Sequence, residues 1–136
     1  MSDSQNFIPV NTPLVDGNEK KYLQDCIDTG WISSEGPFVQ EFEERFARKI
    51  GRKYSISVSS GSAALETAIT ALNLQIGDEV ILPTFTIISC LIPLIRSGVV
   101  PVFIDADPLT WNMDVNRVEE KITPHTKAIM VVHIYG

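Results

Sequence analysis

Two stretches near the N-terminus carry apolar residues at helical spacing. The apolar side chains recur every three or four residues, which is typical of an amphipathic helix packed on one face. These positions are Leu23, Cys26, Ile27, Phe38, Phe42, Phe46 and Ile50. A capping pair, Asp16 and Glu19, precedes the first stretch, and Gly30 follows it. We therefore predict one helix between these signals and a second that begins at Pro37 and ends at Gly51.

Short apolar runs then alternate with helix-forming stretches. We predict buried strands at 54–58, 79–83, 99–104 and 127–136. Helices are expected at 63–72, from 84 toward 96, and around 117–122, where Asn116 and Glu119 have capping spacing. Strands that alternate with helices indicate the α/β class, with a mostly parallel sheet flanked by helices.

The last predicted strand lacks an element to cover it, as a buried parallel strand normally requires. We therefore expect the chain to be the N-terminal part of a longer protein. In this interpretation residues 1–136 form a single incomplete domain, in which a helical segment at 1–53 leads into βα units at 54–136.

Composition narrows the possible partners. Seventeen acidic and eleven basic residues give a net charge of −6, and no basic cluster is present, which argues against nucleic acid or an anionic membrane. No apolar run is long enough to span a bilayer and no signal peptide is evident, so a cytoplasmic protein is expected. Cys26 and Cys90 lack the spacing of a metal site, so we predict buried free thiols and no metal.

The turn between the strand at 54–58 and the following helix is small and polar: Ser59, Ser60, Gly61 and Ser62. The first N–H groups of a helix lack intrahelical acceptors, so such a turn can bind phosphate, with the serine hydroxyls as further donors. An ordinary connection in which Ser62 caps the helix is the alternative. The turn matches neither the P-loop nor the G-x-G-x-x-G pattern.

Ligands of parallel α/β sheets bind beyond the carboxyl ends of the strands. This rule brings together the turn at 59–62 and the segments 84–87, 105–108 and 133–136. Asp105 and Asp107 could bind a metal or act as acid and base, although Pro108 favours a structural turn. His133 could be a base or a core residue. Trp31 could line a pocket or fill the core.

The chain resembles the DegT/StrS-type sugar aminotransferases. The matching stretches include Val58-Ser-Ser-Gly-Ser-Ala-Ala-Leu65 and His133-Ile-Tyr-Gly136, and the joint match, rather than any single stretch, carries the resemblance. Further matches follow in family order at 8–10, 29–34, 35–39, 42–44, 77–86, 98–107 and 112–114. Segments 83–90 and 108–114 look most like perosamine-synthase members, which aminate GDP-4-keto-6-deoxymannose with glutamate as amino donor.

The resemblance implies a fold, a cofactor and a set of site residues. The fold would be the N-terminal portion of the large domain of type I, aspartate aminotransferase-like enzymes, and the cofactor pyridoxal 5′-phosphate (PLP). Ser60, Gly61 and Ser62 would hold the cofactor phosphate, and Phe85 and Ile87 would lie against its ring. Trp31 and Ser33 would line the pocket for a nucleotide-linked 4-keto-6-deoxy sugar. Asp105 and Asp107 would be structural, and the full-length enzyme would be a homodimer.

The catalytic lysine that the family joins to PLP as a Schiff base is expected beyond Gly136. None of the six lysines of the chain matches its motif. The 136-residue chain alone should therefore be inactive. Two alternatives stay open: a dehydratase of the same family, in which histidine replaces this lysine, and a non-catalytic, truncated α/β module that binds or dimerises. A Rossmann-type oxidoreductase is disfavoured because the glycine fingerprint is missing.

Overall fold

The structure is a computed structural model that describes residues 8–134. The chain divides into two compact units, residues 1–57 and residues 58–136. Residues 1–7 and the end of the last predicted strand, Tyr135 and Gly136, lie outside the described residues. The assignment of residues 1–136 to a single incomplete domain stays a prediction.

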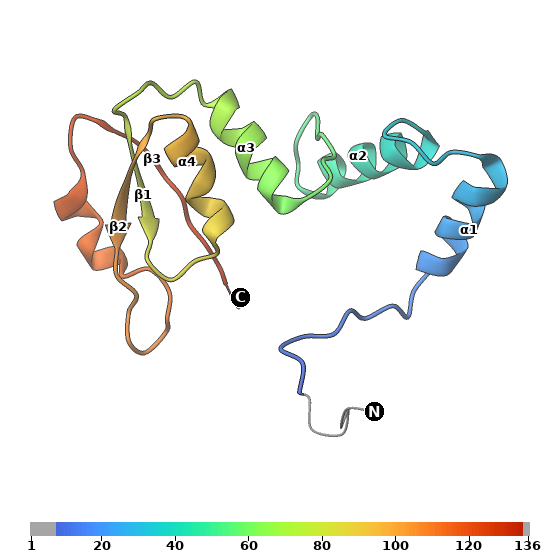
Figure 1. The fold of residues 1–136 in the computed structure, drawn as a ribbon, viewed down its shortest axis with the longest axis horizontal. Helices are drawn as coiled ribbons and strands as arrows, with labels where there is room; N and C mark the ends of the chain where they lie inside the picture. The colour runs from blue at the N-terminus through green and yellow to red at the C-terminus, as the bar shows by residue number, and fades with distance from the viewer. Residues whose placement is uncertain (1–7, 135–136) are drawn as a thin grey trace, which may run out of the picture. The chain divides into compact units, whose positions relative to one another are not determined.

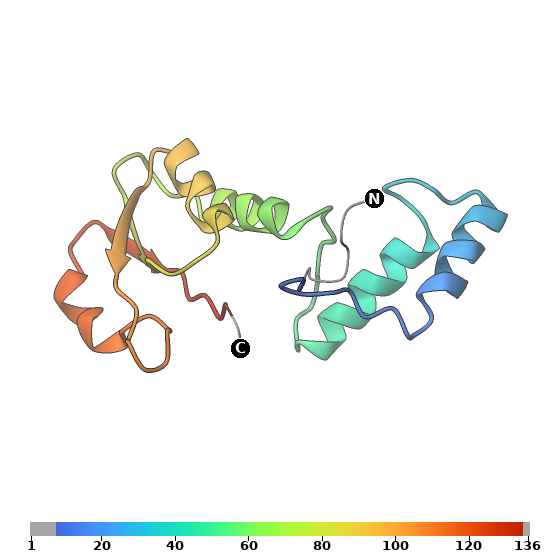
Figure 2. The same ribbon diagram turned by 60° about the horizontal axis from the view of Figure 1, so that its bottom comes forward.

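The first unit contains two helices, α1 (Glu19–Thr29) and α2 (Pro37–Lys49), drawn in blue and teal in Figure 2. Gly30 ends α1 in the left-handed conformation, and Pro37 starts α2, as predicted. Tyr22 and Phe38 join the helices by an edge-to-face ring contact with centroids 5.2 Å apart. The capping prediction is wrong in detail, because Asn18 is the N-cap residue and makes no side-chain cap.

The strand predicted at 54–58 is not formed. Tyr54 and Ile56 are each 75% exposed, and no described strand pairs with this segment. A strand needs a neighbour to accept its backbone hydrogen bonds. Here Ser55 and Ser57 instead hydrogen-bond to Glu43 of α2, so side-chain contacts replace the sheet ladder.

The second unit is built on a three-stranded parallel sheet (Figure 1). Its strands are β1 (Glu79–Pro83), β2 (Val100–Ile104) and β3 (Thr126–Ile129), in the order β2-β1-β3. The central strand β1 is buried on both faces, which explains its unbroken apolar sequence. The predicted strands at 79–83 and 99–104 and the parallel sheet are confirmed.

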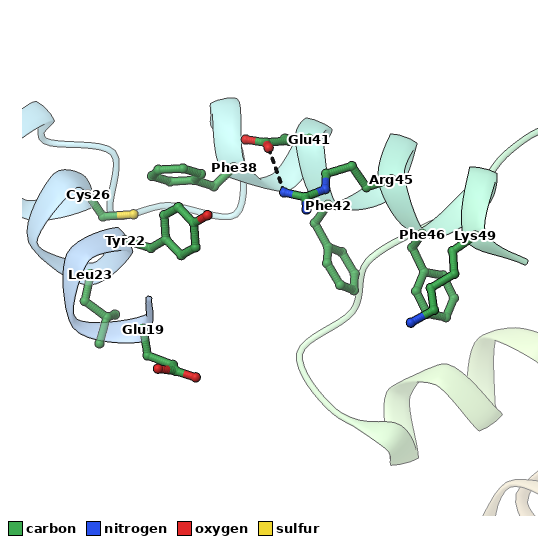
Figure 3. A pocket seen from close by; sticks show the side chains of 10 residues that line it. All are labelled: Glu19, Tyr22, Leu23, Cys26, Phe38, Glu41, Phe42, Arg45, Phe46 and Lys49. Carbon is green, nitrogen blue, oxygen red and sulfur yellow. Dashed lines mark hydrogen bonds and ion pairs between the residues drawn. The ribbon is translucent and has the colours of Figure 1, made fainter. Parts of the chain in front are cut away.

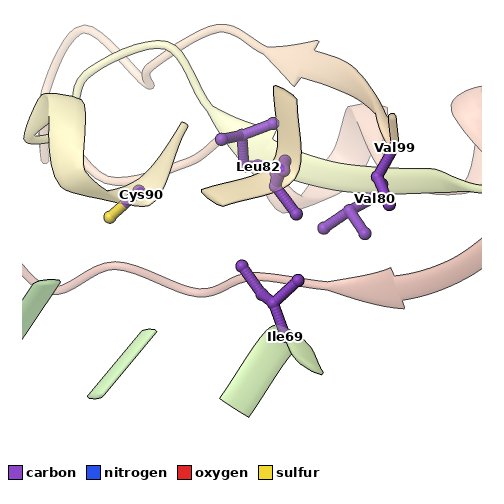
Figure 4. Close-up of a cluster of buried hydrophobic side chains, with 6 residues drawn as sticks. Ile69, Val80, Leu82, Cys90 and Val99 are labelled. Atoms are coloured by element: carbon purple, nitrogen blue, oxygen red, sulfur yellow. The ribbon is translucent and has the colours of Figure 1, made fainter. Parts of the chain in front are cut away.

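One face of this sheet carries a cluster of buried apolar side chains, seen in Figure 4. Helix α3 (Gly61–Ala71) and helix α4 (Ile92–Arg96) pack there. The buried cluster comprises Ile69, Val80, Leu82, Cys90, Leu94 and Val99. Full burial of one such aliphatic side chain contributes roughly 1.5–3 kcal/mol, so this cluster is the main source of stability in the unit.

Three predicted elements are shorter than expected. Residues 84–87 form no helix, and a 3₁₀ turn, η1 (Ile88–Cys90), precedes α4, which has Pro93 near its start. Two 3₁₀ turns, η2 (Val115–Arg117) and η3 (Glu119–Lys121), replace the helix at 117–122, and Asp114, rather than Asn116, caps the first of them. The last strand was predicted at 127–136 but ends at Ile129. The next residue, Met130, still donates its N–H to the Ile81 carbonyl of β1.

Candidate functional site

Segments that are distant in sequence meet beyond the carboxyl ends of β1 and β2. Thr84 directly follows β1 and donates a hydrogen bond from its hydroxyl to Asp105, which directly follows β2, over 3.2 Å. The ring of Phe85 contacts that of Trp111 edge to face, with centroids 5.5 Å apart. The sheet therefore brings 84–87 and 105–108 together, as the topology rule predicts.

The turn before α3 has the geometry of an anion site. Ser60 is the N-cap: its backbone is extended and its Oγ accepts from the Ala63 N–H at 3.2 Å. This corrects the expectation that Ser62 caps the helix. With Ala63 capped, the N–H groups of Gly61 and Ser62 have no intrahelical acceptor. A Cβ on Gly61 would meet no atom within 4 Å, so space is open beside the turn.

Ser62 connects this turn to the segment after β1. Its hydroxyl lies 2.8 Å from the Ser89 hydroxyl, which belongs to η1. Two hydroxyls that share one hydrogen bond keep one proton for another acceptor. Together with the helix N-terminus, the pair suits a doubly charged group such as phosphate.

The segment 84–87 presents one ring and one aliphatic side chain. Phe85 is half-buried, and Ile87 is 59% exposed. Between them, the Thr86 hydroxyl oxygen is buried without a hydrogen-bond partner among the described residues. A buried hydroxyl without a partner costs free energy, so Thr86 is a candidate contact for a bound group that sequence reasoning missed.

Asp107 orders a loop through hydrogen bonds to one of its carboxylate oxygens. Its Oδ1 accepts from the Thr110 N–H at 2.8 Å, the Thr110 hydroxyl at 3.0 Å and the Leu109 N–H at 3.0 Å. These hydrogen bonds, those from Thr110 foremost, lower the pKa of Asp107. Asp105 likewise accepts from Thr84 and from the Ala106 N–H. The carboxylates are thus engaged in local hydrogen bonds, and residues 8–134 contain no cluster of three potential metal ligands.

The remaining predicted residues lie elsewhere. His133 is exposed and follows the end of β3, so it is not a core residue of a strand. Trp31 and Ser33 belong to the first unit, in the loop between α1 and α2. Trp31 is half exposed, and the Ser33 hydroxyl donates to the Glu35 carbonyl at 2.7 Å. Cys26 and Cys90 are both free, as predicted, although only Cys90 is fully buried.

An apolar groove between α1 and α2 was not predicted as a site. It encloses about 740 Å³ and is lined by the apolar faces of both helices, including Tyr22, Leu23, Phe38 and Phe42 (Figure 3). The Arg45–Glu41 ion pair, with its atoms 3.0 Å apart, lies at its edge. The periodicity that predicted the helices is the signal that could have indicated it.

Within residues 8–134, no helix has the length and apolar character needed to cross a membrane.

Comparison with known proteins identifies relatives along almost the whole chain. A family model described as the DegT/DnrJ/EryC1/StrS aminotransferase family matches residues 13–136. The GDP-perosamine synthase of Escherichia coli O157:H7 is 46% identical over 130 residues, which cover 96% of this chain and 36% of that protein.

Solved structures of related proteins superimpose on this chain. GDP-4-keto-6-deoxy-D-mannose-3-dehydratase of E. coli, with bound hydrated PLP, superimposes with a TM-score of 0.82 at 34% identity, over 90% of this chain and 33% of that one. A protein of Streptococcus pneumoniae assigned as a sugar aminotransferase, in its PMP form, gives 0.83 at 31%, over 93% and 32%. The chain therefore spans about a third of the length of the relatives it matches.

Proposed function

The chain belongs to the DegT/DnrJ/EryC1/StrS aminotransferase family, and we propose that its protein is a PLP-dependent aminotransferase of a nucleotide-linked 4-keto-6-deoxy sugar. The carrying observation is the 46% identity to GDP-perosamine synthase over 96% of the chain. This identity favours GDP-4-keto-6-deoxymannose as the substrate. Glutamate is the proposed amino donor, in line with a related dehydratase structure that holds a trapped PLP–glutamate geminal diamine.

The turn at 59–62 fits the phosphate of PLP. Ser60, Gly61 and Ser62 would hold it through the first N–H groups of α3 and through the hydroxyl proton that the Ser62–Ser89 hydrogen bond leaves available. Gly61 leaves the space beside these donors open. The roles of these three residues are proposals that rest on donor chemistry and local geometry.

Phe85 and Ile87 would contact the cofactor ring. Both follow β1, in the segment that also carries the partnerless Thr86 hydroxyl. Bound PLP supplies an electron sink. It would assist the removal of a proton from the amino donor and, later, the addition of a proton to the sugar carbon that carried the keto group. The residues of this chain would orient the ring and hold the phosphate, whereas the lysine that carries the proton is expected beyond Gly136.

Trp31 and Ser33 are the proposed contacts to the sugar nucleotide. Trp31 is half exposed, and sugars and bases pack against aromatic side chains that are accessible. We also propose a homodimeric, cytoplasmic protein without a resident metal, of which residues 1–136 form one incomplete domain.

The dehydratase branch is the alternative function. Its supporting observation is the structural similarity to GDP-4-keto-6-deoxymannose-3-dehydratase, at 34% identity. The identity to GDP-perosamine synthase is higher, which favours the aminotransferase.

Product analysis separates the two functions. The full natural protein, incubated with PLP, glutamate and GDP-4-keto-6-deoxymannose, is expected to form a 4-amino sugar nucleotide, identified by mass spectrometry. A product that has lost the 3-hydroxyl without gaining nitrogen would assign the dehydratase reaction. An unchanged substrate, with PLP shown to be bound, would contradict both.

A further inference from the structure

Trp111 has an unusual backbone conformation. Its φ angle is +60°, in the left-handed region, which bulky side chains rarely adopt. Such a conformation persists only where surrounding contacts enforce it, and it often marks a residue whose placement matters.

The loop that carries Trp111 is closed by hydrogen bonds at both ends. The Trp111 N–H donates to the Asp107 carbonyl at 2.8 Å, and the Asp107 N–H donates to the Asn112 carbonyl at 2.8 Å. The Asp107 carboxylate holds the residues between them by accepting from Leu109 and Thr110. The loop therefore fixes the direction in which the Trp111 side chain leaves the backbone.

Burial of the indole does not explain this arrangement. The Trp111 residue stays 61% exposed, so little of its apolar surface is removed from water. What the loop does achieve is an edge-to-face contact with Phe85, with centroids 5.5 Å apart and planes inclined by 61°. The base of the loop is tied to the same segment, because Asp105 accepts from the Thr84 hydroxyl.

We propose that Trp111 is a positioning residue, which holds the ring of Phe85 in the orientation that contacts the pyridine ring of PLP. The inference rests on the proposed function, since it takes Phe85 as a ring contact. An aromatic ring has two side-chain torsions, and a second ring in contact with it restricts both. Removal of the indole would let Phe85 adopt rotamers that do not contact the cofactor.

The test is PLP binding by four variants of the full natural protein, titrated through the absorbance and circular dichroism of bound cofactor. W111A is expected to weaken PLP binding about two- to tenfold, the range for loss of one aromatic pair. W111F keeps a ring and should restore most of the affinity. W111G relaxes the backbone without supplying a ring, so it should bind as weakly as W111A. L109A is the matched control, since Leu109 lies in the same loop with an 89% exposed side chain.

A second readout separates positioning from general damage. Inorganic phosphate, used as a probe of the turn at 59–62, should bind W111A as it binds the parent protein, because only the ring contact is affected. Unchanged PLP affinity in W111A would overturn the inference. Equal loss of PLP and phosphate binding would overturn it too, because the defect would then extend beyond the ring.

Phe85 variants distinguish this inference from the function on which it rests. F85A should weaken PLP binding, and the double variant F85A/W111A should lose no more than F85A alone if Trp111 acts through Phe85. If the parent protein binds no PLP, the proposed function fails and the inference with it. If F85A weakens binding but W111A does not, the inference alone is wrong.

Discussion

Glu43 and Ser57 are joined by two hydrogen bonds to one oxygen. The backbone N–H and the hydroxyl of Ser57 both donate to Glu43 Oε1, at 2.7 and 2.9 Å. The hydroxyl of Ser55 donates to the Glu43 carbonyl at 2.6 Å. One residue of α2 thus anchors the segment in which a strand was predicted.

Because these hydrogen bonds favour the ionised carboxylate of Glu43, the stability of the folded protein should depend on pH. The Ser57 N–H, and then its hydroxyl, lower the pKa of Glu43 below its ordinary value of 4.5. A lowered pKa means that the stabilisation is present above the unfolded-state value and is lost as the pH falls through the folded-state value. E43A should therefore lower the melting temperature at pH 7 by more than it does in acid.

E44A is the control for that measurement. Glu44 is exposed and adjacent on the same helix, and its side chain makes no hydrogen bond within the described residues. Equal effects of E43A and E44A on the melting temperature at pH 7 would contradict the role of Glu43 as an anchor.

Two constraints favour glycine at position 98: a left-handed backbone conformation and the close approach of Ile76. Its φ is +70°, and a Cβ would lie 3.0 Å from Ile76 Cγ1. G98A should cost about 1–3 kcal/mol of unfolding free energy, measured by denaturant titration. G51A is the matched control, since Gly51 has φ +65° but open space around it. A cost no greater for G98A than for G51A would show that the Ile76 contact contributes nothing.

The buried hydroxyl of Thr86 contributes no hydrogen bond to the fold among the described residues, so its removal should not lower stability. T86V removes a group that has no partner among the described residues, so stability without cofactor should be unchanged or higher by up to ~1 kcal/mol. T84V, which removes the donor to Asp105, should instead lower stability by about 0.5–1.5 kcal/mol. Thermal unfolding of both variants checks the order, and the reverse order would contradict the structure.

The phosphate assignment predicts a selective effect of Ser62. S62A should weaken PLP binding about tenfold, the cost of one hydrogen bond to a charged group, while pyridoxal, which lacks the phosphate, should bind as before. S97A is the control, because Ser97 is exposed and ends the short helix α4. Equal losses for PLP and pyridoxal in S62A would remove Ser62 from the phosphate site.

The pattern of apolar residues correctly predicted the second helix and the central strand of the sheet. The apolar stripe of α2 and the continuous run of β1 both appear in the structure, but only β1 is buried. Phe42 and Phe46 of α2 stay 55% and 44% exposed and line the groove between the helices. The segment 54–58 has strand composition, but pairing depends on a neighbouring strand, and composition does not reveal whether one is present.

The part of the candidate site that a short sequence motif shapes by itself could be predicted from the sequence. The turn at 59–62 needs only a small polar sequence before a helix, although the capping residue proved to be Ser60. Trp111 was missed as a site residue because its contact with Phe85 depends on a loop closed by Asp107, a relationship between segments that spacing does not encode.

The central claim is that the protein transfers an amino group to a nucleotide-linked keto sugar. The most direct measurement uses the full natural protein with PLP, GDP-4-keto-6-deoxymannose and glutamate labelled with ¹⁵N, followed by mass spectrometry of the sugar nucleotide. We predict that the label appears in the sugar, with one equivalent of 2-oxoglutarate formed. Conversion of the sugar without incorporation of label would contradict it.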